Sequence, residues 1–344
     1  MRKYLLPECG NFYKANLHCH SNCSDGKLTP EEIKDLYKRH GYSIVAYTDH
    51  NILLDHSDLA DNEFLPLLGY EVDIQDFVVD QLRKTCHMCF ISLEPDNIQV
   101  CWHRSGKYLF RGGMDRINEV KIDPNAPDYD PVYSANGIND MIKKAKAHGY
   151  FVTYNHPYWS VEGYPEYTKY MGMDAMEVIN GSCLSLGYDE YNTHAYDDLL
   201  RTGHKLYCIA ADDNHNNHPE GSRRCDSLIG VTMIKAEKLE YRTVTKAMED
   251  GHFYATTGPE IHELWFEGEE LHIECSDADR VTLNTGTRRA AVAFPEEGEL
   301  TLNKATFKVS PKDKYVRLTV FDRNGKCAYT NAYFTDEIYE NERK

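Results

Sequence analysis

Short apolar runs alternate with helical patterns along the first two-thirds of the chain. Alternation of strands and helices implies parallel strands. Seven strands within about 210 residues predict a barrel related to the eightfold (β/α) barrel but smaller. The predicted strands are Ala15–His20, Ser43–Tyr47, Leu67–Val72, Cys86–Leu93, Tyr150–Tyr154, Ala175–Ile179 and Lys205–Ala210.

Three helices are predicted between these strands from their start and stop signals. The first begins at Thr29-Pro30-Glu31-Glu32, where Thr29 and Glu32 have the spacing of a capping box and proline takes the first helical position. Glycine ends each helix. The first stops at Gly41, and the others span Ile138–His148 and Tyr188–Thr202.

Two segments depart from this alternation. Residues 94–133 are polar and rich in Asp, Asn, Pro and Gly, which predicts an insertion or lid-like loop with a hairpin around Ser105-Gly106. After Gly258-Pro259 the pattern becomes short alternating runs with turns at Glu297-Gly298 and Asn324-Gly325, typical of a small all-β sandwich. The sequence therefore predicts an α/β domain over 1–258 and a small β-sandwich-like domain over 259–344. The predicted strands of the second are Leu271–Cys275, Arg280–Leu283, Ala290–Phe294, Ala305–Val309 and Tyr315–Phe321.

The composition of the chain argues against several classes of function and location. The formal net charge of −17 argues against long nucleic acid as a partner, because duplex binding depends on basic patches. No stretch approaches the ~20 apolar residues of a membrane helix, and the first ten residues lack the apolar run of a signal peptide. We therefore expect a cytoplasmic protein whose eleven cysteines are free thiols. The oligomeric state is left open.

Metal-ligand side chains recur where the predicted strands end. In a strand, residues i and i+2 point to the same side, so the two imidazoles of His18 and His20 project together. Barrel enzymes carry their catalytic groups at the carboxyl ends of strands. Imidazoles with carboxylates suit zinc, iron or manganese. The candidate ligands are His18, His20, Asp25, His50, Glu71, His87, His156, Asp213 and His215.

Taken in order, these motifs resemble the polymerase and histidinol phosphatase (PHP) family. The resemblance covers roughly Asn11 to Gly258 and implies a distorted (β/α)7 barrel of the PHP type. The last family motif usually reads Gly-Ser-Asp-Ala-His, and here the spacing to His215 favours Asp213 over Asp212 as its aspartate. The residues that carry the resemblance are Asn16-Leu17-His18-Cys19-His20-Ser21, Ser24-Asp25-Gly26, Thr48-Asp49-His50-Asn51, Gly69-Tyr70-Glu71, His87, Asn155-His156-Pro157 and Asp213-Asn214-His215.

The resemblance also implies how two or three divalent transition metal ions would be held. One ion would take His18, His20, Glu71 and Asp213. A second would share Glu71 and add His87 and His156. A third would take Asp25, His50 and His215.

The predicted activity is hydrolysis of a small phosphate monoester or nucleotide-type substrate by a hydroxide that bridges the metals. Metal ions lower the pKa of bound water to about 7 and grip phosphoryl oxygens. Two alternatives stay open: a metallohydrolase of carboxylic or carbamate esters, and a non-catalytic, metal-binding PHP domain. The residues predicted to carry the catalysis are Glu71, Asp213, His215, Arg224 and His218.

Each residue given a functional role outside the ligand set also has an interpretation in which it has no function at the site. Arg224, in the pair Arg223-Arg224, is either a phosphate clamp or an exposed loop charge, and His218 is either a proton donor or a bystander. Glu177 and Asn180 either orient ligand histidines or are ordinary strand-end residues. Tyr158-Trp159 either stacks on substrate or packs against the fold.

Overall fold

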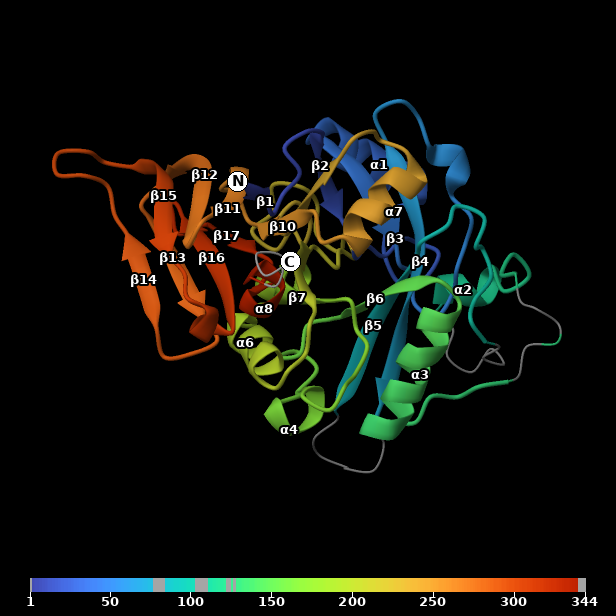
Figure 1. The fold of residues 1–344 in the computed structure, drawn as a ribbon. Helices are drawn as coiled ribbons and strands as arrows, with labels where there is room; N and C mark the ends of the chain where they lie inside the picture. Colours follow the sequence, from blue (N-terminus) through green and yellow to red (C-terminus); the bar gives the residue numbers. More distant parts are fainter. Residues whose placement is uncertain (1, 77–83, 103–110, 122–124, 126–127, 340–344) are drawn as a thin grey trace.

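The computed structural model describes residues 2–76, 84–102, 111–121, 125 and 128–339. Its main feature is a 14-stranded sheet in the order β14-β13-β16-β17-β10-β9-β2-β3-β4-β5-β6-β7-β8, with β18 paired to β16. The predicted α/β class is confirmed (Figure 1). The strands that match the seven predicted ones are β2 (Asn11–Asn16), β3 (Tyr42–Tyr47), β4 (Leu65–Gln75), β5 (Thr85–Ser92), β6 (Tyr150–Tyr154), β7 (Ala175–Asn180) and β8 (Tyr207–Ala211).

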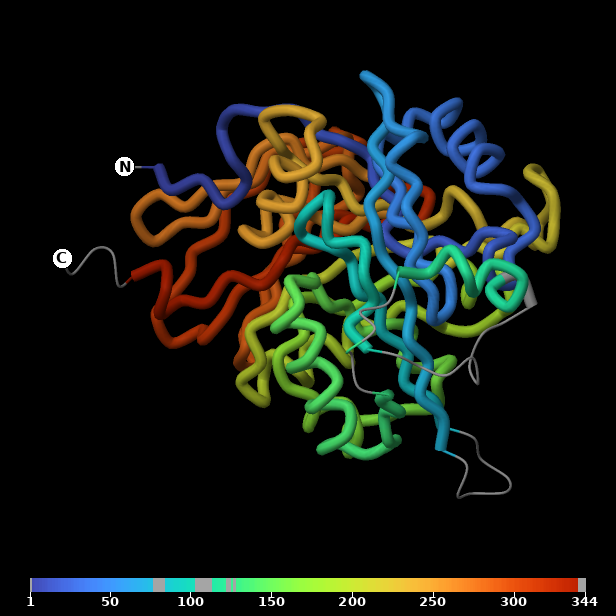
Figure 2. The backbone as a smooth tube through the Cα atoms, turned by 90° about the vertical axis from the view of Figure 1, so that its right-hand side faces the viewer, coloured from blue at the N-terminus to red at the C-terminus, as the bar shows by residue number. Residues whose placement is uncertain are grey.

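The prediction that all seven strands are parallel is wrong. β5 runs antiparallel to both β4 and β6, although β2–β3–β4 and β6–β7–β8 are parallel. A parallel connection needs a crossover of a dozen or more residues, usually a helix. The short link from Gln75 to Thr85 leaves no room for one. β4 and β5 form the long hairpin that extends from the body of the molecule in Figure 2.

The predicted (β/α)7 barrel is not confirmed, because the structure shows no closed barrel. β8 lies near β9 and β2, yet no ladder of paired backbone groups joins β8 to either strand in the described residues. The contacts between these strands and the segments that follow them include an isolated bridge from Cys19 to Asn214 and hydrogen bonds between the Thr232 hydroxyl and Ala210. The predicted strand Ala15–His20 corresponds to β2, which ends at Asn16. Cys19 lies beyond this end and pairs through the isolated bridge, so the strand ends four residues earlier than predicted.

The start of α1 (Pro30–Arg39) is confirmed to the residue, because its capping signal is complete in the sequence. The capping box at Thr29 and Glu32 is formed, and α1 ends before Gly41, whose φ is 78°. α3 (Ala135–Ala147) begins three residues before its predicted start. The remaining helices are α2 (Arg111–Asp115), α4 (Tyr164–Tyr167), α5 (Gly181–Leu186), α6 (Thr193–Arg201), α7 (Tyr241–Glu249) and α8 (Thr335–Tyr339), with 3-10 turns at Ser57–Leu59 and Pro311–Asp313.

The third predicted helix begins at Thr193 instead of Tyr188. Tyr191 forms a bridge with Ile179, and the buried Glu190 accepts hydrogen bonds from the backbone of Tyr158 and Trp159. These tertiary contacts hold residues 188–192 out of the helix. The hairpin predicted at Ser105-Gly106 lies outside the described residues.

The C-terminal strands form two facing sheets. One is β1-β11-β12-β15, and the other contains β13, β14, β16 and β17. Leu264 and Ile273 of the first sheet share a core with Val281 and Leu318 of the second, as in a sandwich. Because β17 also pairs with β10, the larger sheet runs on into the first 258 residues, and the domain boundary at 258 stays a prediction.

The bounds of the strands outside the first seven follow. They are β1 (Lys3–Tyr4), β9 (Val231–Ala236), β10 (Phe253–Thr256), β11 (Ile261–Glu267), β12 (Glu270–Ala278), β13 (Arg280–Thr285), β14 (Ala290–Ala293), β15 (Leu302–Lys308), β16 (Tyr315–Phe321), β17 (Cys327–Thr330) and β18 (Tyr333–Phe334). No described helix is long and apolar enough to cross a membrane. All eleven cysteines are free, as predicted.

Candidate metal centre

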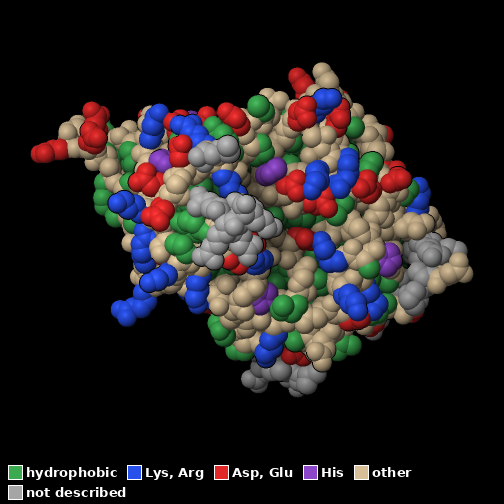
Figure 3. Space-filling view, in the orientation of Figure 1, with side chains coloured by type: hydrophobic (Ala, Val, Ile, Leu, Met, Phe, Trp, Pro, Cys, Tyr) green, Lys and Arg blue, Asp and Glu red, His purple; other side chains and the backbone are tan. Residues whose placement is uncertain are grey.

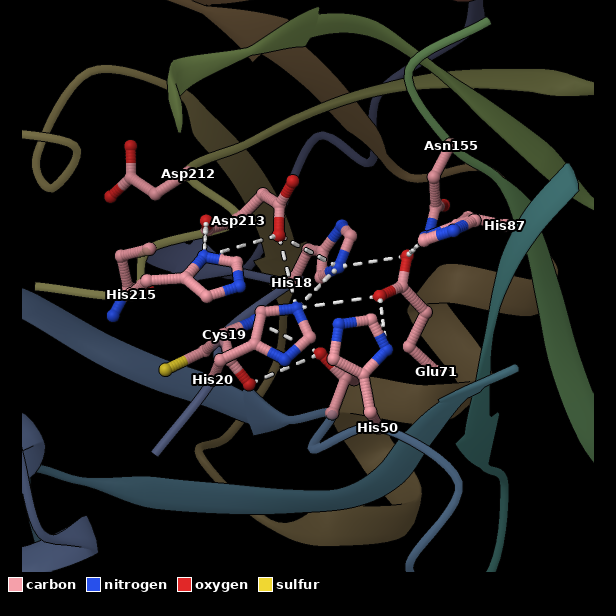
Figure 4. A network of polar contacts seen from close by, with 12 residues as sticks. His18, Cys19, His20, His50, Glu71, His87, Asn155, Asp212, Asp213 and His215 are labelled. Atoms are coloured by element: carbon pink, nitrogen blue, oxygen red, sulfur yellow. Dashed lines mark hydrogen bonds and ion pairs between the residues drawn. The ribbon is translucent and has the colours of Figure 1, made fainter. Parts of the chain in front are cut away.

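Figure 4 shows imidazoles and carboxylates from distant segments converging at one point. Each comes from a strand of the large sheet or from the loop that follows it. His18 and His20 follow β2, and His50 follows β3. Glu71 lies within β4, and His87 lies in the neighbouring strand β5, where it pairs with Asp73. The strands therefore bring together all nine candidate ligands. The remaining four are Asp25 from the loop after β2, His156 after β6, and Asp213 with His215 after β8.

The tightest group consists of His18, His20, Glu71 and Asp213. His18 Nε2 lies 3.1 Å from His20 Nε2 and 3.2 Å from Asp213 Oδ1, and His20 Nε2 lies 3.0 Å from the same oxygen. Glu71 oxygens lie 3.2 Å from His18 Nε2 and 3.4 Å from His20 Nε2. A tetrahedral ion with bonds of about 2.0–2.1 Å keeps its ligand atoms about 3.3 Å apart. The spacing and chemistry of these four groups therefore fit a divalent transition metal.

A second group surrounds the other side of the Glu71 carboxylate. His87 Nδ1 lies 3.2 Å from Glu71 Oε1, and His50 Nδ1 lies 3.2 Å from Oε2. His156 Nε2 lies 3.4 Å from Oε1 and 3.8 Å from Asp213 Oδ2. Glu71 thus stands between two groups of imidazoles, in the position of a bridging ligand.

A third group consists of His20, Asp25, His50 and His215. The His20 ring stacks between those of His50 and His215, with centroids 4.4 Å from each. His20 Nδ1 is buried without a hydrogen-bond partner in the described structure and lies 3.8 Å from Asp25 Oδ1. A buried nitrogen without a hydrogen-bond partner beside a carboxylate fits the role of a cation ligand. The resemblance places His20 at the first ion alone, whereas the geometry also sets it beside the third group.

The loop that carries Asp25 is shaped by a glycine in the Ser24-Asp25-Gly26 motif. A Cβ at Gly26 would lie 2.4 Å from the carbonyl oxygen of His20. The Gly26 amide donates to the Ser21 carbonyl at 2.9 Å, which closes the turn. Only glycine allows the loop to fold back this closely and set Asp25 beside His20 and His215.

Polar partners behind the ligands orient their rings. Glu177 Oε1 lies 2.7 Å from His18 Nδ1, which puts a proton on Nδ1 and leaves the Nε2 lone pair facing the other ligands. Glu177 also accepts from the His156 backbone amide, at 3.1 Å. Asn180 donates to Glu177 at 2.8 Å and to Asp213 Oδ2 at 3.2 Å. For Glu177 and Asn180, the geometry therefore favours a role in orienting the ligand histidines over that of ordinary strand-end residues.

Asp212 and Asp213 occupy different environments. Asp213 faces His18 and His20, whereas the Asp212 carboxylate turns away from the ligands (Figure 4). Asp212 accepts the backbone amides of residues 228, 229 and 230 at 2.6, 2.8 and 2.8 Å and the Tyr37 hydroxyl at 2.7 Å. Asp213 is thereby the aspartate placed for ligation, and Asp212 anchors the loop before β9.

Electrostatics keep the central carboxylates ionised. Burial alone would raise the pKa of Glu71, but the imidazoles of His18, His87 and His50 hold it well below its usual range. Burial likewise opposes ionisation of Asp213, yet His18 and His20 hold its pKa below the ordinary value. The backbone of the site is also strained, with φ of 52° at Asp213 and 27° at His156. Strain of this kind persists where surrounding structure imposes it, often at functional sites.

The ligands open onto a cavity of about 850 Å³. Arg224 and His218 line it, so the structure brings both predicted catalytic residues to the site; Arg223 is not among the lining residues. The Trp159 ring packs edge-on to His87 and His156 at 5.3 and 5.0 Å. On the face drawn in Figure 3, acidic and basic side chains are interspersed, so no broad basic surface appears there.

Sequence reasoning missed several groups at this site. Asn155 donates to Glu71 Oε1 at 3.0 Å, and Ser160 lies 3.2 Å from His156 Nδ1. Asn155 was visible within the Asn155-His156-Pro157 motif, but its role depends on a partner 84 residues away. Lys84 and Tyr188, which line the cavity, carry no sequence signal that sets them apart from surface residues.

No protein-family model and no curated protein matches the chain. Three solved structures share features of its fold. One, from Bacteroides vulgatus, is a two-domain protein containing a predicted PHP-like metal-dependent phosphoesterase, with 15% identity over 96% of this chain and 98% of that one and a TM-score of 0.43. Another, from Bifidobacterium adolescentis, is described as a metal-dependent phosphoesterase, with 16% identity over 63% and 91% of the two chains and a TM-score of 0.38.

The third is an amidohydrolase from Chromobacterium violaceum with bound sulfate and no metal. It is 18% identical over 58% of this chain and 87% of that one, with a TM-score of 0.37. Because identity is low in each case, the function of this chain is inferred from its own residues.

Purified protein is expected to contain at least two equivalents of transition metal. The expectation rests on the two groups of ligands that share Glu71. Elemental analysis after purification without chelator measures the content. Less than one equivalent of zinc, iron and manganese combined would contradict it and would favour a domain without a metal-dependent activity.

Proposed function

We propose that this protein is a metal-dependent phosphoesterase that hydrolyses a small phosphate monoester or nucleotide-type substrate. The observation that carries the proposal is the convergence of nine imidazole and carboxylate groups, seven of which line a cavity of about 850 Å³ that Arg224 and His218 also line. The ordered motifs that resemble the PHP family support the same activity. Two or three bound divalent ions of zinc, iron or manganese would activate water at neutral pH and neutralise phosphoryl oxygens.

The chain's own residues have distinct tasks in this proposal. Glu177 fixes the tautomer of His18, and Glu71 and Asp213 present carboxylate oxygens to the ions. Arg224 binds phosphoryl oxygens, since its guanidinium is exposed and makes no ion pair or side-chain hydrogen bond within the described residues. His218, partly buried at the same cavity, donates a proton to the leaving alcohol oxygen.

Arg224→Ala is expected to weaken substrate binding, with KM rising about tenfold or more, since a charge-assisted hydrogen bond contributes about 1.5–3 kcal/mol. Metal content should stay at the wild-type level, because Arg224 is not among the proposed ligands. Steady-state kinetics and elemental analysis measure the two effects. Arg223→Ala is the matched control, because Arg223 does not line the cavity. Equal KM values for both variants and the wild type would remove Arg224 from the site.

A substrate panel separates this proposal from its main alternative. Metal-analysed protein is assayed with phosphate monoesters, nucleotides, carboxylic esters and carbamates under identical conditions. Phosphate release with kcat/KM above that of every carbonyl ester is expected. Preference for a carboxylic or carbamate ester would replace the proposal with a carbonyl-directed metallohydrolase.

A further inference from the structure

A second cluster of ligand-type side chains lies beside the metal centre and shares none of its nine residues. Cys23, Asp49 and His56 each offer one atom, and the three atoms lie within 4.8 Å of one another. The residues come from the loop after β2, the end of β3 and the turn before the 3-10 helix at Ser57–Leu59. We propose that these three residues form a separate thiolate-containing zinc site, here called the Cys23 site.

All three side chains are withdrawn from solvent. The exposed fraction is 0% for Cys23, 3% for Asp49 and 9% for His56. The His56 ring packs on Tyr47, with centroids 4.8 Å apart, and its nitrogens make no hydrogen bond within the described part of the chain. An imidazole that makes no hydrogen bond within the described residues and lies against a thiol and a carboxylate is placed as a ligand.

The Asp49 carboxylate is held for this role by its own donors. It accepts the Ser21 amide at 2.8 Å, the Ser21 hydroxyl at 2.7 Å and the Ser24 hydroxyl at 2.6 Å. A carboxylate has about four lone-pair sites, so about one remains for an ion. Hydrogen bonds to a ligating carboxylate fix its orientation and raise metal affinity.

The donor set selects the kind of ion. Thiolate and imidazole favour zinc among available divalent ions, and they disfavour magnesium and calcium, which require oxygen ligands. Binding releases the thiol proton to solvent as the sulfur–metal bond forms. Three protein ligands leave a fourth position for water. The charged groups near Cys23 also include an ion pair in the segment after α2. In this pair, Arg116 Nη1 lies 3.3 Å from Glu119 Oε2.

An ion bound at the Cys23 site would hold in place two segments that carry ligands of the main centre. Cys23 is two residues from Asp25, and Asp49 precedes His50. A single ion would therefore tie the loop that carries one ligand to the strand end that carries another. The Cys23 site does not depend on the phosphoesterase proposal, since an ion held by these three residues would be present whatever the substrate.

Cobalt substitution tests the Cys23 site directly. The full-length protein is stripped of metal, reloaded with Co²⁺ and examined for the near-ultraviolet charge-transfer absorption that only thiolate ligation gives. The main centre's proposed ligands are nitrogen and oxygen alone, so the band reports on cysteine. Variants Cys23→Ser and His56→Gln are compared with Cys89→Ser, which removes the thiol that accepts from Asn155 at 3.1 Å near the main centre.

The expected result is a thiolate band in the wild type and in Cys89→Ser, its loss in Cys23→Ser, and a weaker or shifted band in His56→Gln. Zinc content should fall by about one equivalent in Cys23→Ser. No band in the wild type, or a band that survives Cys23→Ser, would overturn the Cys23 site. If Cys23→Ser does not fold, the wild-type and His56→Gln spectra decide. Esterase assays on the same preparations report separately on the phosphoesterase proposal.

Discussion

Glu71→Gln is expected to abolish measurable hydrolysis and to lower metal content by about one ion. Loss of one electrostatic contact to a transition state typically costs about 10²–10³ in rate, and Glu71 serves two groups of ligands at once. Gln keeps the size of the side chain but removes the charge that offsets repulsion between neighbouring cations. Five imidazole nitrogens lie within 3.4 Å of its oxygens, those of His18, His20, His50, His87 and His156.

The measurement is kcat on the best substrate of the panel, with elemental analysis on the same sample. His262→Gln is the matched control, since His262 lies on β11 with a side chain 51% exposed, away from the cavity. A Glu71→Gln protein with near-native rate and full metal occupancy would rule out the bridging role.

Asp213→Asn is expected to lower activity, and Asp212→Asn is expected to lower stability. Asp213→Asn should lower kcat by about 10²–10³ through loss of a ligand charge, with little change in stability. Asp212→Asn should keep part of the metal but destabilise the fold by about 1–3 kcal/mol, because its amide cannot satisfy the buried donors that now point at a carboxylate. Those donors are the amides of Leu228, Ile229 and Gly230 and the Tyr37 hydroxyl.

Urea denaturation and metal analysis of the two variants, made side by side, separate these effects. The pair is informative because the substitutions are chemically identical and adjacent in sequence. If Asp212→Asn lost the metal while Asp213→Asn kept it, the assignment of ligand and anchor would be reversed.

Local signals in the sequence were sufficient for most strands and for the start of one of the three predicted helices. The capping box at Thr29 and Glu32 predicted the start of α1 to the residue, because the signal is complete within four positions. The start of α6 was misplaced because Glu190 and Tyr191 are held by segments remote in sequence. The antiparallel placement of β5 follows from a short connection, which the periodicity of each strand does not reveal.

The sequence by itself determined the kinds of ligand available and their order along the chain. Imidazoles and carboxylates at strand ends suit transition metals, whatever the strand directions are. Only the tertiary structure decided which groups meet: that His20 faces two groups of ligands, that Asp212 turns to the loop before β9, and that Cys23 lies beside His56. These facts depend on contacts between residues far apart in the chain, and such contacts form only when the sheet aligns the ends of its strands.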